Sequence, residues 1–113
     1  MRRLQTGDVF KMARIIKSLG IREELTKIAV DARKEDGSTD MEAVGIKAFM
    51  LVMESCADAT VENKIYDLLA GITEKNVEDI KTQTLDVTIQ DIRKIAKEND
   101  VANFFKSAAR LTQ

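Results

Sequence analysis

The sequence predicts an all-α fold, a compact bundle of about five to six helices around a central apolar helix. Three observations support this prediction. The chain contains no proline and only five glycines, and proline is the residue that most strongly interrupts a helix. Apolar residues recur at helical spacing in segments that begin with capping residues. The densest apolar run, Met41 to Ala57, lies near the middle of the chain.

Length and composition fit one domain that covers residues 1–113. A chain of 113 residues, 44% of them hydrophobic, can bury roughly two thirds of its unfolded surface. The single cysteine, Cys56, cannot form an intramolecular disulfide and is typical of a small buried side chain in a reducing compartment. No charged and apolar leader marks the chain for secretion, so we expect a cytoplasmic protein.

The first two helices are predicted at Gly7–Leu19 and Arg22–Lys34. Thr6 is a good N-cap for the first helix, and Asp8 lies in its first turn, where the helix dipole favours a negative charge. Gly20 is placed to end this helix in a left-handed conformation. The second helix carries inward-facing residues at the spacing i, i+3, i+4, i+7, namely Leu25, Ile28, Ala29 and Ala32.

The central helix is predicted to follow a turn at Glu35–Ser38. Thr39 and Glu42 have the spacing of a capping box, in which each side chain satisfies a backbone donor of the other residue. Lys47 is the only charge between residues 43 and 53, so the helix is apolar on most of its circumference and needs cover. Either it is the buried centre of the bundle, or it is partly exposed for a partner or a sister subunit.

Two further features of the central helix carry predictions. Gly45 lies inside it, where glycine costs about 1 kcal/mol relative to alanine, so we expect another backbone to approach closely at that point. The run is shorter than the roughly 18–20 apolar residues that span a bilayer. We therefore expect no membrane helix.

Four helical segments are predicted after the central helix. A fourth helix starts at Asp58 or Thr60 and ends near Gly71. Leu85, Val87 and Ile89 alternate like a strand, but the residues after them return to helical spacing. The remaining segments are a short one capped by Thr73 at Glu74–Lys81, then Thr88–Glu98 and Val101–Leu111.

Charge is unevenly distributed along the chain. Residues 1–34 carry nine Lys or Arg against four Asp or Glu, whereas residues 35–64 carry two against seven. A basic start and an acidic middle can meet within one fold or head to tail between copies. The second arrangement predicts self-association.

The residues that most enzymes and metal sites need are missing from the sequence. There is no histidine, so general base catalysis near neutral pH would require a strongly perturbed Glu or Lys. One cysteine without histidine rules out tetrahedral zinc. The segment Asp31–Glu42 has the length of a calcium loop, but Arg33 takes its third position and Gly37 falls one residue late. We expect no catalytic, cofactor-binding or metal-binding residues and no enzymatic activity.

The C-terminal segment 88–111 weakly matches a helix-turn-helix. Asp100 stands where glycine is usual, Lys106 falls where an apolar packing residue is expected, and residues 85–113 carry five Lys or Arg against four Asp or Glu. DNA readers show a stronger basic face. A plain helical hairpin packed on the central helix is favoured, and nucleic acid is not expected as a partner.

The five methionines have two interpretations. They are common filler in cores, or, with phenylalanine, they line an adaptable groove for an apolar helix, because flexible thioethers suit varied partners. The candidate partner-binding residues are Phe10, Met12, Met50, Met53, Phe104 and Phe105.

Three stretches together resemble a known family. They are RRLQTGDVFKMARIIKSLGIREEL at the start, ENKIYDLLAGI in the middle and IRKIAKENDVANFFKSAARL at the end. With its length and order of helices, the chain resembles the tail assembly chaperones of long-tailed bacteriophages and prophages of Gram-positive bacteria, the siphophage type. The three stretches match mainly in the spacing of their apolar residues. This evidence is specific when the stretches are taken together and weak for each stretch alone.

The resemblance implies an all-α protein that tends to oligomerise and has no active site. Such chaperones are thought to coat the long, aggregation-prone tape measure protein until tail tube subunits replace it. They act in the host bacterial cytoplasm, and we do not expect them in the mature virion. Tube binding belongs to a longer form made by a ribosomal frameshift, and we do not assign it to this chain. The alternative is a small helical regulatory protein that binds DNA or another protein.

Overall fold

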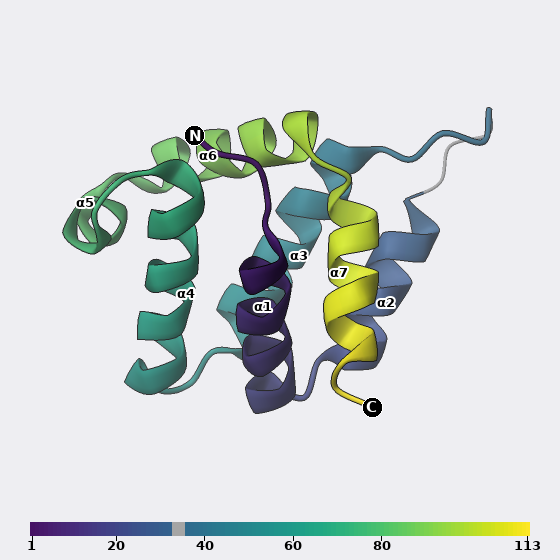
Figure 1. Ribbon diagram of the computed structural model, residues 1–113, viewed down its shortest axis with the longest axis horizontal. Coiled ribbons are helices and arrows are strands. Elements are labelled where there is room, and N and C mark those ends of the chain that lie inside the picture. The colour runs from purple at the N-terminus through teal and green to yellow at the C-terminus, as the bar shows by residue number, and fades with distance from the viewer. Residues whose placement is uncertain (33–35) are drawn as a thin grey trace.

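A computed structural model describes residues 1–32 and 36–113 of the chain, and these residues form seven helices (Figure 1). The Cα radius of gyration is 13.1 Å, close to the roughly 13 Å expected for a compact domain of this length. The all-α prediction is confirmed, with a helix count slightly above the predicted range. In chain order the helices are α1 (Thr6–Leu19), α2 (Arg22–Asp31), α3 (Met41–Ser55), α4 (Ala59–Thr73), α5 (Val77–Thr82), α6 (Leu85–Glu98) and α7 (Val101–Arg110).

The caps of the first helices lie one residue away from their predicted positions. Gln5 precedes α1, and its backbone N–H donates to the Asp8 carboxylate over 2.8 Å, so Thr6 is the first helical residue and not the cap. Asp40, not Thr39, caps α3, because its carboxylate accepts the N–H of Ala43. The predicted end of the second helix at Lys34 and the first residue of the predicted turn, Glu35, lie outside the described residues.

Boundaries in the second half also differ from the prediction. Helix α4 continues past Gly71, and the hydroxyl of its last residue, Thr73, donates to the Leu69 carbonyl, so Thr73 caps no following helix. The side chain of Asn76 caps α5 instead. Helix α6 begins at Leu85, three residues before the predicted start, because the Thr84 carbonyl already accepts the first helical N–H groups.

The helices pack as pairs around one core. Helix α3 packs along α6, α2 along α7, and α1 lies between α7 and α4, while α6 crosses one end of the bundle (Figure 1). Helix α6 makes its main contacts with α3, whereas α7 makes its main contacts with α2 and α1 and fewer with α3. The two helices of the predicted C-terminal hairpin therefore do not pack along each other. The largest fully buried apolar side chains are those of Ile15, Ile16, Leu25 and Val44.

Gly45 marks the close approach of α3 and α6. A Cβ atom added at this position would lie 3.2 Å from Cγ2 of Ile92 and 3.3 Å from Cβ of Ala96. Both neighbours belong to α6 and are buried. The expected close approach is therefore confirmed, and its partner is α6.

Helix α3 is covered on one face and open on the other. Val44, Ala48 and Val52 are buried, whereas Met50 and Met53 are 39% and 44% exposed. The apolar circumference of α3 thus exceeds what the fold covers. The structure therefore shows α3 buried in the core on one side and exposed on the other.

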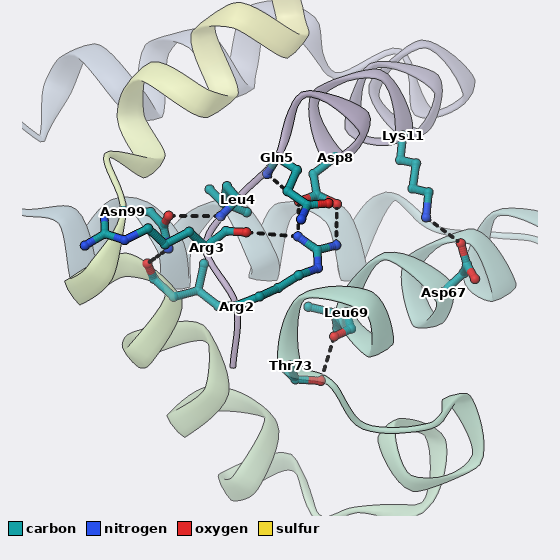
Figure 2. A network of polar contacts seen from close by, with 11 residues as sticks. Arg2, Arg3, Leu4, Gln5, Asp8, Lys11, Asp67, Leu69, Thr73 and Asn99 are labelled. Carbon is teal, nitrogen blue, oxygen red and sulfur yellow. Dashed lines mark hydrogen bonds and ion pairs between the residues drawn. The ribbon is translucent and has the colours of Figure 1, made fainter.

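A clasp formed by residues 1–5 ties the start of the chain to the bundle (Figure 2). The Arg2 guanidinium makes two bonds to the Asp8 carboxylate, of 2.7 and 2.9 Å, and the Arg2 backbone N–H donates to the Ile72 carbonyl at 3.0 Å. The backbone N–H of Leu4 donates to the Asn99 side chain at 3.1 Å. The clasp therefore joins α1 to α4 and to the α6–α7 connection.

The Asp8 carboxylate is only 2% exposed. Burial alone raises the pKa of a carboxyl group, but the hydrogen bonds from Arg2 and from the Gln5 backbone outweigh it, so the pKa of Asp8 lies below its usual value of 3.8. A lowered folded-state pKa stabilises the protein above the unfolded-state pKa. That contribution is lost as the pH falls through the folded-state pKa.

We expect Asp8→Asn to lower the free energy of unfolding at pH 7 by about 1–3 kcal/mol, because Arg2 loses its charged acceptor. The difference from wild type should shrink as the pH falls from about 4, the usual pKa of an unfolded Asp, toward the lower folded-state pKa of Asp8. Urea denaturation at pH 7 and pH 3 measures both effects.

The control is Asp67→Asn, which removes the exposed Lys11–Asp67 ion pair of 3.3 Å. Exposed pairs contribute about 0–1 kcal/mol, so this variant should resemble wild type. Equal destabilisation by the two variants would show that the clasp is not a special contact.

Candidate partner-binding groove

A surface groove of about 340 Å³ lies between α3, α4, α5 and the start of α6. Its walls are mainly apolar. Among its large apolar residues, Met53 and Leu85 are the most exposed, at 44% and 51%. The apolar residues that line it are Phe49, Met53, Cys56, Ile65, Tyr66, Leu69, Ile80 and Leu85.

The groove follows from how α3 and α6 cross. Near the start of α3, Gly45 contacts Ile92 on α6, and further along α3 Met53 lines the groove together with Leu85 from the start of α6. The two helices therefore run antiparallel. Because α4 packs on α1 and α5 instead, a space remains between α4 and the α3–α6 pair.

A partly buried polar network fixes the α5–α6 wall of the groove. The Lys75 ammonium donates to the Gln83 side chain and to the Asp91 carboxylate, each at 2.9 Å. The Gln83 amide in turn donates to the Thr88 hydroxyl at 2.8 Å and to Asp91 at 3.1 Å. These bonds hold the connection before α6, and with it the position of Leu85.

Charged groups lie at the edge of the groove. Glu62 and Lys81 line it, and the Tyr66 hydroxyl donates to the Glu62 carboxylate. This hydrogen bond raises the pKa of Tyr66 above its usual value of 10.0. The phenol therefore remains a protonated donor at neutral pH.

An apolar cavity of about 70 Å³ lies behind the groove, between α1, α3, α4, α6 and α7. Phe49, Ile65 and Leu69 line both spaces. These three side chains therefore form a shared wall between the groove and the cavity.

Three of the six candidate residues lie in the core. Met12, Phe104 and Phe105 are each 8% exposed, and all three line the cavity and not the groove. The two phenylalanine rings meet edge to face, with centroids 5.3 Å apart. The prediction that Met12 and Phe104 line a surface groove is corrected accordingly, because α7 buries their side of the bundle against α1 and α3.

The other three candidates are exposed, but they are not together. Met53 lines the groove. Met50 lies one turn earlier on the open face of α3, and Phe10 projects from the outer face of α1, 51% exposed. The structure thus brings one of the six candidates into the groove.

Sequence reasoning missed most of the groove. Phe49, Ile65 and Ile80 look like ordinary core residues of their helices, and nothing local distinguishes them. Leu85 gave one signal, since it is a large apolar residue outside the predicted helix. Its exposed place in the first turn of α6 explains why it follows no buried stripe.

Within residues 1–32 and 36–113, no three His, Cys, Asp or Glu side chains are arranged to hold a metal ion. In the same part of the chain no helix has both the length and the apolar character to cross a membrane. Comparisons with protein families, with curated proteins and with solved structures found no match.

We expect Phe104→Asp and Met53→Asp to affect stability very differently. A carboxylate at Phe104 is buried in the core, so the loss should be at least about 4 kcal/mol, enough to unfold much of the protein. At Met53 the carboxylate stays hydrated, and the free energy of unfolding should change by less than about 1 kcal/mol. Thermal melts followed by circular dichroism measure both. Similar melting temperatures for the two variants would contradict the assignment of core and groove.

Proposed function

We propose that this chain is a non-enzymatic tail assembly chaperone that binds and solubilises the tape measure protein during phage tail morphogenesis. The observation that carries the proposal is the open apolar groove beside α3, 340 Å³ in volume and bordered by Met53 and Leu85. The resemblance of three sequence stretches to such chaperones supplies the identity of the partner.

A physical need connects the groove to this partner. A long amphipathic helix made before its tube exists exposes an apolar stripe, which aggregates unless another surface covers it. Helix-in-groove recognition covers such a stripe through anchor residues at i, i+3, i+4 and i+7. The groove volume is at the lower end of the roughly 300–1,000 Å³ typical of ligand pockets, so it fits anchor side chains and not a whole helix.

Methionine side chains let this surface accept partner segments of different sequence. Met50 and Met53 are both exposed on one side of α3, and their flexible thioethers adapt to differently shaped apolar residues. A chaperone for a long helical protein contacts many different stripes. The open face of α3 extends the groove in the way that such a partner requires.

The remaining parts of the proposal follow from the resemblance. The chain acts in the host bacterial cytoplasm, is absent from the mature virion, associates with itself, and reaches the tail tube protein only through a longer frameshifted form. The alternative of DNA binding through the last two helices has weaker support. In a helix-turn-helix these helices pack on each other, whereas here α6 packs along α3 and α7 along α2 and α1.

Co-expression with the tape measure protein of the same phage genome tests the proposal. Wild type should increase the soluble fraction of the tape measure protein, and Met53→Asp and Leu85→Asp should abolish that increase, because the groove would bury an unpaired carboxylate. Val30→Asp is the matched control, since Val30 is 53% exposed and lies on α2, away from the groove.

If wild type leaves the tape measure protein insoluble, the chaperone proposal is wrong. If wild type solubilises it and the two groove variants do so equally well, the partner binds elsewhere.

A further inference from the structure

The cavity between α1, α3, α4, α6 and α7 has an apolar lining throughout. Water occupies a buried space only where about two to four polar groups hold it, and the side chains around this cavity offer no oxygen or nitrogen atom. In the part of the chain that the structure describes, every buried side-chain oxygen or nitrogen already has a hydrogen-bond partner. The cavity therefore favours an apolar occupant over water.

The volume of the cavity sets the size of that occupant. The cavity measures about 70 Å³, which is about half of the roughly 150 Å³ of an engineered apolar cavity that stays dry and binds benzene or xenon. Drug-sized molecules need pockets of roughly 300–1,000 Å³ and are too large. A xenon atom, or a hydrocarbon smaller than benzene, fits the space.

Short side chains on α3 account for the cavity. Ala48, which is fully buried, and Val52, which is 4% exposed, line it from this helix. Helix α3 cannot close the space by moving toward α6, because a Cβ atom added at Gly45 would already lie 3.2 Å from Ile92. The cavity is thus a consequence of how these two helices pack.

The groove provides a route into the cavity. Phe49, Ile65 and Leu69 line both spaces, and Phe49 and Ile65 are only partly buried. Side chains at a surface change rotamer within picoseconds to nanoseconds, whereas opening the bundle would require helices to separate. A small molecule therefore passes from the groove to the cavity when one of these side chains moves.

We propose that the cavity is a binding site for a small apolar molecule, a noble-gas atom or a short hydrocarbon, which enters from the groove past the shared wall. Binding removes the apolar surface of this molecule from water, and atoms of the lining gain dispersion contacts that they lack on the cavity side. The occupant needs no protein partner. The site is therefore independent of the proposed function and is tested without the tape measure protein.

Xenon is the probe, and the amide proton–nitrogen correlation spectrum of the full chain under rising xenon pressure follows its binding. Signals of cavity-lining residues such as Val52 and Leu69 should shift along one saturating curve, whereas the signal of the exposed Val30 on α2 should change little. The melting temperature should rise by roughly 2 °C at the pressure that half-saturates the site, because xenon binds the folded state only.

Two matched substitutions on α3 locate the site. Val52→Ile adds one methylene group at the cavity, so it should weaken xenon binding at least about threefold and leave the melting temperature unchanged or higher. Val44→Ile adds the same group at a fully buried position that does not line the cavity. It should bind xenon like wild type and melt at a lower temperature, since a packed core has no room for the group.

Ala48→Leu adds three carbon atoms at the cavity and should abolish saturable xenon binding. If this variant does not fold, the comparison of Val52→Ile with Val44→Ile decides. Three results would overturn the inference: signals that shift linearly with xenon pressure and never saturate, a Val52→Ile variant that binds xenon as tightly as wild type, or an equal loss of binding in Val44→Ile.

Discussion

The contact between α3 and α6 at Gly45 determines where the groove lies. The contact is tight, since a Cβ atom added at Gly45 would lie 3.2 Å from Ile92 and 3.3 Å from Ala96 and the neighbouring side chains would have to shift. Antiparallel helices fixed at one end keep a defined register along their length, so Met53 lies near Leu85 at the other end. Helix α4 leaves this pair to pack on α1 and α5. The groove is the space that results from a close contact at one end and a divergence at the other.

Two buried carboxylates hold the parts of the chain that helix packing alone does not fix. Asp8 binds Arg2 and thereby fastens residues 1–5, and Asp91 binds Lys75 and Gln83 and thereby fastens the α5–α6 connection. Both residues are at most 6% exposed. A buried charge without a partner is strongly unfavourable, so each segment has one well-defined position. The second of these positions forms a wall of the groove.

Sequence reasoning recovered the helices better than the site, for physical reasons. Helical spacing in Gly7–Leu19 and Val101–Leu111 reflects burial of one face, and the helices found there agree within one residue at each end. The position of a helix cap was harder to predict where two residues that can cap a helix are adjacent, as at Thr39 and Asp40. For Phe104, residue type could not distinguish core from surface, because an apolar side chain suits both. That distinction depends on which helices lie beside α7, and local spacing does not encode it.

The shared wall of Phe49, Ile65 and Leu69 makes the floor of the groove compliant. Behind these side chains lies an empty apolar space of about 70 Å³, where atoms lack contacts on one side. If these side chains change rotamer, the groove deepens into that space without a shift of a helix backbone. The displaced atoms then gain contacts in the void, which offsets the work of moving them. The depth of the groove can therefore adjust to large and small apolar side chains.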